Sequence, residues 1–139
     1  MTIGDLDFGS RPLFLAPMED VTDISFRILC KEQGAAMEYT EFVPSEGLVR
    51  DAVKAIAKMH TLPEEAPVGI QIYGHILENM VDAARMADRA AELAGGHGAD
   101  IIDINFGCPV SKIAGRGAGS GMMREPDKMV AITKAVVDA

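Results

Sequence analysis

The stretch Ala99-Asp100-Ile101-Ile102-Asp103-Ile104-Asn105-Phe106-Gly107-Cys108-Pro109 is an apolar run that ends in a polar turn. Such a run is typical of a strand that is buried on both faces of a parallel sheet, so residues 99–106 are predicted to form a strand. Gly107 lets the backbone approach a neighbouring group closely, and Pro109 stiffens the turn. Cys108 lies between them and is our candidate reactive group at the carboxyl end of this strand.

Three earlier segments repeat the pattern of a short apolar run followed by a helix. Residues 12–18, 36–42 and 68–73 are predicted to form strands. Four helices are predicted. The first is capped by Thr22 or Asp23 and ends at Gly34, and the last begins at Pro126. The two between them span residues 50–60 and 77–93.

Helical spacing also predicts which side of each helix is buried. The apolar face of the first helix is predicted to contain Phe26, Leu29, Cys30 and Gln33, and that of the last helix Met129, Thr133, Val136 and Val137. On this reading Cys30 is an inert core residue.

Strands that alternate with helices predict an α/β fold with a parallel sheet and right-handed crossovers. The four βα units span about 35 residues each, close to the repeat of a (β/α)8 barrel of about 250 residues. We therefore predict a TIM-barrel type of fold, of which the chain supplies about the first four βα units.

The composition is that of a globular protein with an apolar core. The chain has 139 residues, 48% of them hydrophobic, and a formal net charge of −8, which argues against nucleic acid or an anionic membrane as an electrostatic partner. Two cysteines do not make a disulfide framework, so we expect a reducing, cytoplasmic setting. We find no signal peptide and no apolar run of the roughly 18 residues that a membrane helix requires.

Polar residues lie at or near the carboxyl ends of all four predicted strands. They are Glu19 and Asp20, then Glu41, then Gln71, then Asp103 and Asn105. Ligands of parallel α/β folds bind where strands end at their carboxyl side. Any one of these groups could be a satisfied side chain in an ordinary turn, but four strand ends together favour a site.

Residues 114–121 form a glycine-rich stretch that follows Cys108. It lacks the Gly-Lys-Ser/Thr ending of a nucleotide phosphate loop, so we expect a flexible loop over the site. Lys112 and Arg116 are available there to meet an anionic ligand, and an equally good reading is that both are solvated loop charges.

Metal binding is not predicted. No second cysteine lies within zinc-binding distance of Cys108, and the three histidines share no ligand spacing. We expect His60 and His97 at the surface. His75 follows the third predicted strand and could reach the site, but its default role is to cap a helix.

Taken together, these blocks resemble the tRNA-dihydrouridine synthase family. The matching segments, in chain order, are residues 15–23, 26–27, 39–42, 71–74 and 103–109, then Lys112, then residues 117–119. The Asn-x-Gly-Cys-Pro block is specific when it is joined to the Ala-Pro-Met block at residues 16–18.

The resemblance implies an FMN-bound TIM barrel with a C-terminal helical domain for tRNA. Reduced FMN passes a hydride to C6 of a uracil base, a cysteine protonates C5, and NADPH reduces the flavin again. By position, Cys108 is the proton donor, and Pro17, Met18 and Glu19 line the flavin. Glu19 departs from the small residue common at that place.

Two further residues take roles from the same resemblance. It assigns Gln71 to a hydrogen bond with the flavin ring and Asn105 to a contact with the base or the flavin. Protonation of a carbon atom requires a thiol that still holds its proton, so we expect a neutral Cys108.

By the same resemblance, residues 1–139 are the N-terminal half of the catalytic barrel, without the rest of the barrel or the helical domain. We therefore expect the isolated chain to be inactive, to bind FMN weakly or not at all, and to self-associate through exposed strand edges. Two alternatives stay open: an FMN-dependent TIM-barrel dehydrogenase acting on a free pyrimidine, and a non-catalytic half-barrel module.

Overall fold

The computed structural model describes residues 1–139. Its seven strands form a two-stranded sheet and a five-stranded sheet. The strands are β1 (Thr2–Ile3), β2 (Leu6–Asp7), β3 (Phe14–Leu15), β4 (Met37–Tyr39), β5 (Val43–Pro44), β6 (Val68–Tyr73) and β7 (Ile101–Ile104).

Every pair in the five-stranded sheet is parallel, and the strands follow chain order across it. β4 and β5 both pair with one edge of β6, at Glu38↔Val68 and Val43↔Ile72, while β7 pairs with the other edge. The order is therefore β3, β4 with β5, β6, β7. This arrangement confirms the predicted α/β class and is consistent with the first part of a TIM barrel, although the sheet is not closed.

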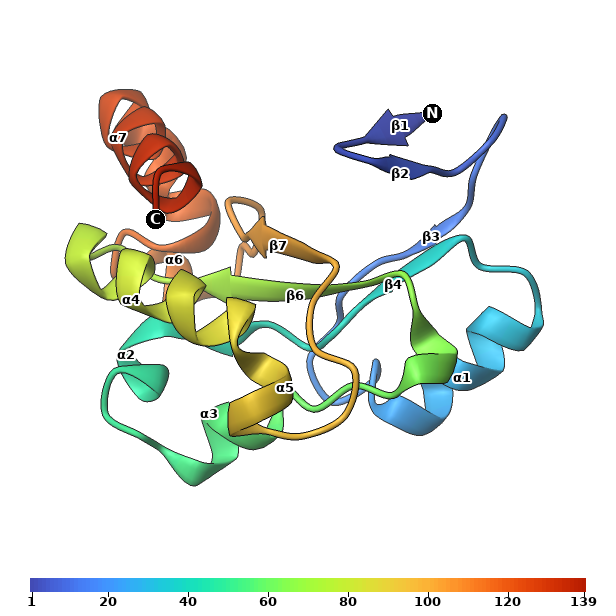
Figure 1. Ribbon diagram of the computed structural model, residues 1–139. Helices are drawn as coiled ribbons and strands as arrows, with labels where there is room; N and C mark the ends of the chain where they lie inside the picture. Colours follow the sequence, from blue (N-terminus) through green and yellow to red (C-terminus); the bar gives the residue numbers. More distant parts are fainter.

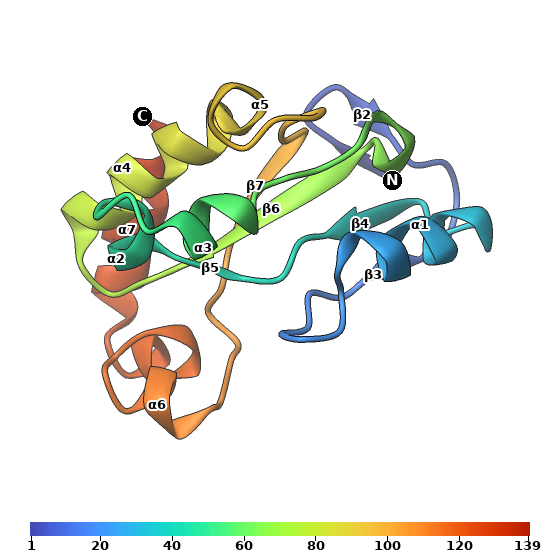
Figure 2. The ribbon, with the colours of Figure 1, turned by 90° about the horizontal axis from the view of Figure 1, so that it is seen from below.

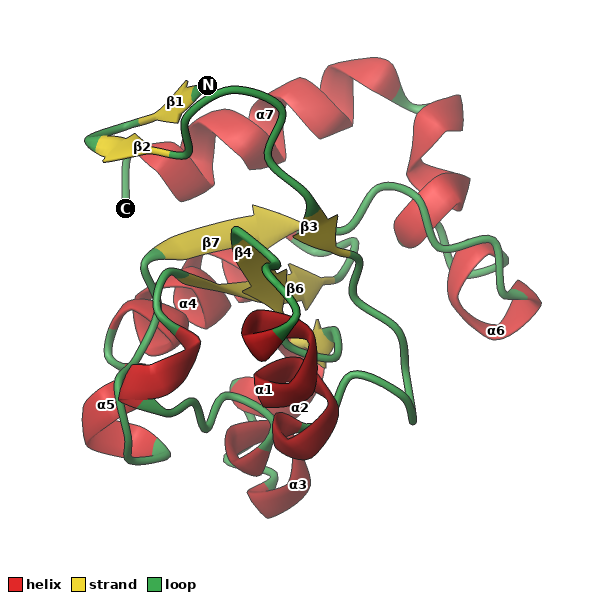
Figure 3. Ribbon diagram, turned by 90° about the vertical axis from the view of Figure 1, so that its right-hand side faces the viewer, coloured by secondary structure: helices red, strands yellow, loops and turns green.

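The helices alternate with the strands as predicted. They are α1 (Ile24–Glu32), α2 (Ser45–Leu48), α3 (Val53–Ala57), α4 (Leu77–Asp88), α5 (Ala90–Leu93), α6 (Ser111–Ala114) and α7 (Pro126–Val137), with 3-10 turns at Pro63–Glu65 and Gly119–Arg124. In the view of Figure 3, α1 to α5 lie below the five-stranded sheet and α7 lies above β7, next to the β1–β2 hairpin. α4 and α7 nevertheless share one buried core with β6. No helix combines the length and the hydropathy needed to cross a membrane.

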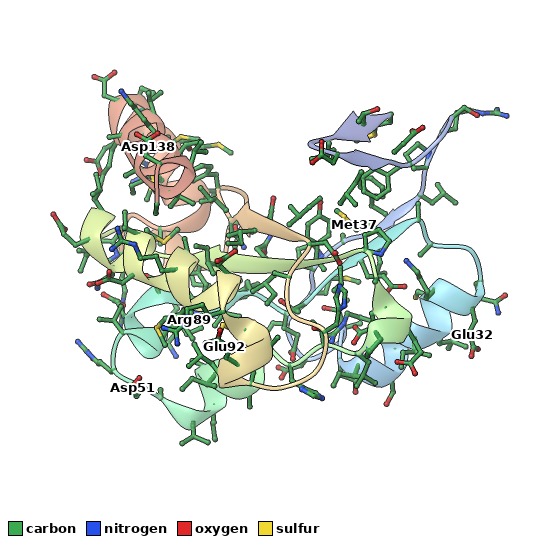
Figure 4. The ribbon with its side chains drawn as sticks, in the orientation of Figure 1. Glu32, Met37, Asp51, Arg89, Glu92 and Asp138 are labelled. Carbon is green, nitrogen blue, oxygen red and sulfur yellow. The ribbon has the colours of Figure 1, made fainter.

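Five predicted elements have different bounds. The strands at residues 12–18, 36–42 and 99–106 are shorter than predicted, and the helix at 50–60 contracts to α3. The helix predicted at 77–93 divides at Arg89, whose backbone leaves the helical region with φ −96° and ψ 20°. Arg89 and Glu92 meet beside this break (Figure 4), and Nη2 of Arg89 lies 2.8 Å from the Glu92 carboxylate.

The antiparallel hairpin of β1 and β2 was not predicted. It lies apart from the main sheet, close to the amino end of the chain (Figure 1). Phe8, just after β2, packs its ring edge-on against Phe14 of β3 at a centroid distance of 4.9 Å. This contact joins the hairpin to the first strand of the sheet.

The core lies between the sheet and the helices α4 and α7. Ile70 and Ile72 of β6 meet Met80 of α4 and Ile132 of α7 in one buried cluster. Because alternate residues of a strand face opposite ways, Gln71 and Tyr73 lie on the other face of β6. The helix-facing residues thus supply stability, and the opposite face is left for polar groups.

The predicted buried face of α7 is partly wrong. Met129 and Val136 pack against the core, but Ile132 is the fully buried residue and Val137 is 78% exposed. Thr133 is also exposed. Its hydroxyl donates 2.8 Å to the carbonyl of Met129, one turn earlier.

The predicted apolar face of α1 is wrong. The residue of α1 that the fold buries is Arg27, whereas Leu29 is 52% exposed and Cys30 is only half-buried. Nε of Arg27 forms a salt bridge with the buried carboxylate of Glu65, and Nη1 donates 2.7 Å to the carbonyl of Thr22. A paired guanidinium can be buried, which hydrophobic periodicity does not anticipate.

Candidate active site

The Cys108 turn is held by the side chain of Asn105. Oδ1 of Asn105 accepts hydrogen bonds from the backbone N–H of Gly107 at 3.0 Å and of Cys108 at 2.9 Å. The carbonyl of Cys108 accepts 3.0 Å from the N–H of Ser120. The turn is therefore fixed both from the strand that precedes it and from the loop that follows it.

Gly119 allows that loop to close against Cys108. A Cβ atom at this position would lie 2.6 Å from the carbonyl oxygen of Cys108, and the φ of Gly119 is +54°. Any side chain would therefore clash and be strained. In the view of Figure 2, the loop with α6 extends away from the body of the fold beyond β7.

Gln71 and Asn105 are joined across the strands β6 and β7. Gln71 and Asp103 are direct partners in the parallel register, and Nε2 of Gln71 donates 2.5 Å to Oδ2 of Asp103. Nδ2 of Asn105 donates 3.0 Å to Oε1 of Gln71. Gln71 is 7% exposed and Asn105 8%, so both amides are almost completely buried.

The turn after β3 is organised by Thr22, which sequence analysis treated only as a helix cap. Oγ1 of Thr22 accepts 3.0 Å from the N–H of Met18 and donates 3.0 Å to the Met18 carbonyl. Asp23 is the N-cap of α1, since its side chain accepts 2.8 Å from the N–H of Phe26. The buried Thr22 thus fixes the backbone beside Pro17.

Glu19 and Asp20 make contacts with residues of other loops and helices, and neither lines the cavity of Cys108. The carboxylate of Glu19 forms a salt bridge with Lys58, and the N–H of Asp20 donates 2.6 Å to Oε1 of Glu41. The side chain of Met18 is 42% exposed. These contacts tie the turn after β3 to the loop after β4.

A cavity of about 400 Å³ lies where the strands end. It is lined by Pro17, Phe42, Gln71 and residues 104–109, which include Asn105 and Cys108. Four of the residues predicted for a site, Pro17, Gln71, Asn105 and Cys108, therefore border one cavity, and they come from β3, β6 and β7 or the turns that follow them; Glu41 does not line it. Neither Met18 nor Glu19 lines it.

A second cavity of about 300 Å³ adjoins the first, and Phe42 borders both. Its wall carries the cations Lys112 and Arg116, the carboxylates Glu19 and Glu46, and the side chains of Tyr73 and His75. Neither Lys112 nor Arg116 forms a salt bridge in the structure, so both charges are open to a ligand.

Tyr73 forms the wall of the second cavity together with Phe42. The two rings meet edge-to-face, with centroids 5.1 Å apart. Burial raises the pKa of the Tyr73 hydroxyl above its ordinary value, and the charges of Glu19 and Glu46 raise it further. The hydroxyl therefore stays protonated and can donate a hydrogen bond. The role of the two rings in this wall was not predicted from the sequence, because it depends on contacts between strands.

The histidines lie outside the Cys108 cavity. His75 does not cap α4, whose N-cap is Ile76 with no side-chain cap, so that prediction is wrong. The prediction for His60 is also wrong, since its ring is half-buried and Nδ1 lies 3.0 Å from the carbonyl of Ala94. His97 is exposed, as predicted.

Comparison with known proteins assigns the chain to a family. The family "Dihydrouridine synthase (Dus)" matches residues 14–139, which include every residue of the Cys108 cavity. The chain belongs to the dihydrouridine synthase family. The recognition made from the sequence is therefore confirmed.

The chain is similar to bacterial members of this family along its whole length. tRNA-dihydrouridine synthase B of Xanthomonas campestris is 38% identical over 139 residues, which cover 100% of this chain and 40% of that protein. A probable tRNA-dihydrouridine synthase of Rhizobium leguminosarum is 41% identical over 125 residues, covering 90% of this chain and 37% of that protein. tRNA-dihydrouridine synthase B of Escherichia coli is 37% identical over 139 residues, which cover 100% of this chain and 41% of that protein. This dihydrouridine synthase chain thus spans about 40% of the length of the relatives it matches.

Proposed function

We propose that this chain forms part of an enzyme that reduces uridine to 5,6-dihydrouridine in tRNA, with FMN and NADPH as cofactors. The observation that supports this most directly is the cavity that Pro17, Gln71, Asn105 and Cys108 share. These are the residues for which the family resemblance implies flavin contact, base contact and proton donation. Membership of the family and the names of its relatives support the same activity.

The cavity suits the ring system of a flavin. Its volume of about 400 Å³ lies in the usual range for small-molecule sites. One N–H of the Gln71 side chain is bonded to Asp103, which leaves the second N–H for a ligand. The backbone of Pro17 and Met18, fixed by Thr22, would form an edge for the ring. FMN bound here in its reduced form would supply the hydride for C6 of the uracil, and NADPH would then reduce the flavin again.

Cys108 would complete the reaction at C5. As hydride adds to C6, the electrons of the C5–C6 double bond take the proton from Sγ, and the resulting thiolate recovers a proton from water. Asn105 holds the backbone of Cys108 in place, so the thiol need not be ordered during the reaction. A base that reaches this recessed cavity must leave its stack in the RNA.

The cavity offers no cation for the phosphate of FMN. The residues that line it are apolar or carry amides and one thiol, and no Lys or Arg is among them. We therefore propose that the chain alone binds FMN weakly or not at all, and that it does not catalyse the reaction. Absorbance titration of the 139-residue chain with FMN tests this, and a yellow, active protein would contradict it.

Lys112 and Arg116 are proposed to bind phosphates of the RNA next to the target base. They line the second cavity, which adjoins that of Cys108, and they have no partner of their own. Of the two carboxylates in the same wall, Glu19 is paired with Lys58, which leaves Glu46 as the unpaired negative charge that an anion bound by Lys112 and Arg116 would face. Each nucleotide next to the target uracil would bring a phosphate group to this cavity.

A chimera tests the activity. Residues 1–139 would replace the matching segment of the Escherichia coli synthase B, and dihydrouridine would be measured in tRNA from a strain that lacks the enzyme. We expect dihydrouridine with the chimera and almost none after Cys108→Ala. Unchanged dihydrouridine formation by the Cys108→Ala chimera would remove Cys108 from the mechanism. NADPH oxidation with free uracil but not with tRNA would favour a dehydrogenase of free pyrimidines.

Thiol alkylation tests the anion subsite in the chain itself. Two cations without a salt bridge in the cavity that adjoins that of Cys108 should make Cys108 react faster with iodoacetate relative to neutral iodoacetamide, and Lys112→Ala with Arg116→Ala should lower that rate ratio about threefold or more. Arg124→Ala is the matched control, because Arg124 is an exposed cation of the same loop that lines neither cavity. An equal ratio in the parent and the double variant would refute the subsite.

A further inference from the structure

Three buried or half-buried side chains form a continuous row of hydrogen bonds that ends at the Cys108 backbone. Asp103 accepts from Gln71, Gln71 accepts from Asn105, and Asn105 accepts from the N–H groups of Gly107 and Cys108. Gln71 and Asn105 are almost completely buried, so water does not replace these partners. Nothing in the proposed reaction uses Asp103.

The direction of the row is decided at its two ends. A carboxylate only accepts hydrogen bonds, so Asp103 requires the NH₂ group of Gln71 to face it. Backbone N–H groups only donate, so Gly107 and Cys108 require Oδ1 of Asn105 to face them. Both requirements leave Nδ2 of Asn105 opposite Oε1 of Gln71, and this is the 3.0 Å bond observed.

An amide between two neutral partners could turn over, because its oxygen and its nitrogen have nearly the same shape. Reversing Gln71 would place Oε1 against the carboxylate of Asp103 and NH₂ against NH₂ of Asn105. Asp103 is the only charged member of the row. Because hydrogen bonds to a charged group are stronger than those between neutral groups, Asp103 contributes most to excluding the reversed arrangement of Gln71.

We infer that Asp103 is a positioning residue that fixes the orientation of the Gln71 amide and, through the bond from Asn105 to Gln71, holds Asn105 in place against the turn that presents Cys108. It would touch neither the base nor the flavin. Its effect on catalysis rests on the proposed function, whereas its effect on the turn does not. Asp103 would also determine which atoms of Gln71 remain for a ligand in the cavity, namely one N–H.

Moving the carboxylate along the row provides the test. In Asp103→Leu, the charge that fixes the amides is lost, and we expect the amide protons of Gly107 and Cys108 to exchange with deuterium about tenfold faster or more, measured by NMR. In the double variant Asp103→Leu with Asn105→Asp, the carboxylate at 105 faces the same two N–H groups, and Gln71 can turn to donate to it. Exchange should then return to within about threefold of the parent.

The double variant separates positioning from general stabilisation. If Asp103 only stabilised the pairing of β6 and β7, recovery at Gly107 and Cys108 would not follow from a second change in the same row. The internal control is the backbone N–H of Asn105, which donates to the carbonyl of Ile72 and should keep its protection throughout. Unchanged exchange in Asp103→Leu, or no recovery in the double variant, would overturn the inference.

A milder variant covers the case in which Asp103→Leu does not fold. Asp103→Asn keeps the size of the side chain, but its amide can present either an oxygen or a nitrogen to Gln71. We expect about threefold faster exchange at Gly107 and Cys108 and doubled NMR signals from the NH₂ of Gln71. A single set of signals with parental exchange rates would refute the role of the charge. These measurements need neither FMN nor RNA, so they can fail while dihydrouridine formation by the chimera succeeds, or the reverse.

Discussion

Glu38 should make the stability of this fold fall as the pH rises. It lies fully buried on β4, and neither of its carboxyl oxygens has a hydrogen-bond partner. Burial raises its pKa from 4.5 to about 7, against the attraction of Lys31 and Arg27, while Glu65 raises it further. In the folded protein this carboxyl therefore holds its proton well above the pH at which the unfolded chain releases it.

The sign of the effect follows from the proton balance. Between pH 4.5 and about pH 7, the folded state binds more protons than the unfolded state. The free energy of unfolding therefore decreases as the pH rises through that interval. The difference between the two pKa values corresponds to about 3 kcal/mol, most of it lost between about pH 5 and pH 8.

The replacement Glu38→Gln removes the titration and keeps the size of the side chain. Urea unfolding followed by circular dichroism at about pH 5 and pH 8 gives the free energy of unfolding of the parent and the variant. We expect the variant to gain about 2 to 3 kcal/mol relative to the parent between these two pH values. Glu64→Gln is the control, since Glu64 is exposed. A parent-to-variant difference that stays constant within about 0.5 kcal/mol would show that Glu38 is ionised in the folded protein.

Three further outcomes follow from contacts elsewhere in the fold. Arg27→Met leaves the Glu65 carboxylate buried without its partner and should lower the free energy of unfolding by about 3 to 5 kcal/mol in urea titration; a loss below about 1 kcal/mol would contradict a strong buried pair. Gly69→Ala places a Cβ 2.6 Å from the ring of Tyr39 and should cost about 1 to 3 kcal/mol by thermal unfolding, a cost that should shrink in a Tyr39→Ala background. The unpaired outer edges of β3 and β7 should make the chain associate at micromolar concentration in sedimentation velocity, and a purely monomeric boundary would disprove this.

The sequence predicted the fold where a single periodicity governs a segment. Residues 68–73 form a strand as predicted, and the helix that begins at Pro126 starts there, because an unbroken apolar run and an N-terminal proline are local signals. Prediction failed for the buried face of α1, where Arg27 is buried only because Glu65, 38 positions later, neutralises it. The helical periodicity around Arg27 carries no information about a partner that lies 38 positions later in the sequence.

The same division applies to the site. Gln71, Asn105 and Cys108 could be placed together from the sequence, because the carboxyl ends of neighbouring parallel strands meet at one edge of the sheet. The role of Thr22 could not, since its two bonds to the Met18 backbone depend on how the turn after β3 folds back. The flavin contacts assigned to Met18 and Glu19 remain predictions.

The contacts that shape the Cys108 turn all come from β6, β7 and the loop that follows β7. The row from Asp103 to Cys108 uses no residue outside these segments, and Ser120 closes the turn from the same loop. The groups that would hold the phosphate of FMN are absent from the cavity these segments form. On the proposed function, the orientation of Cys108 and the affinity for FMN would therefore be separate properties, because the first depends on contacts between adjacent strands and the second on charges supplied from elsewhere. We therefore expect this chain, which spans about 40% of the length of its relatives, to form the turn at Cys108 even if it binds FMN weakly.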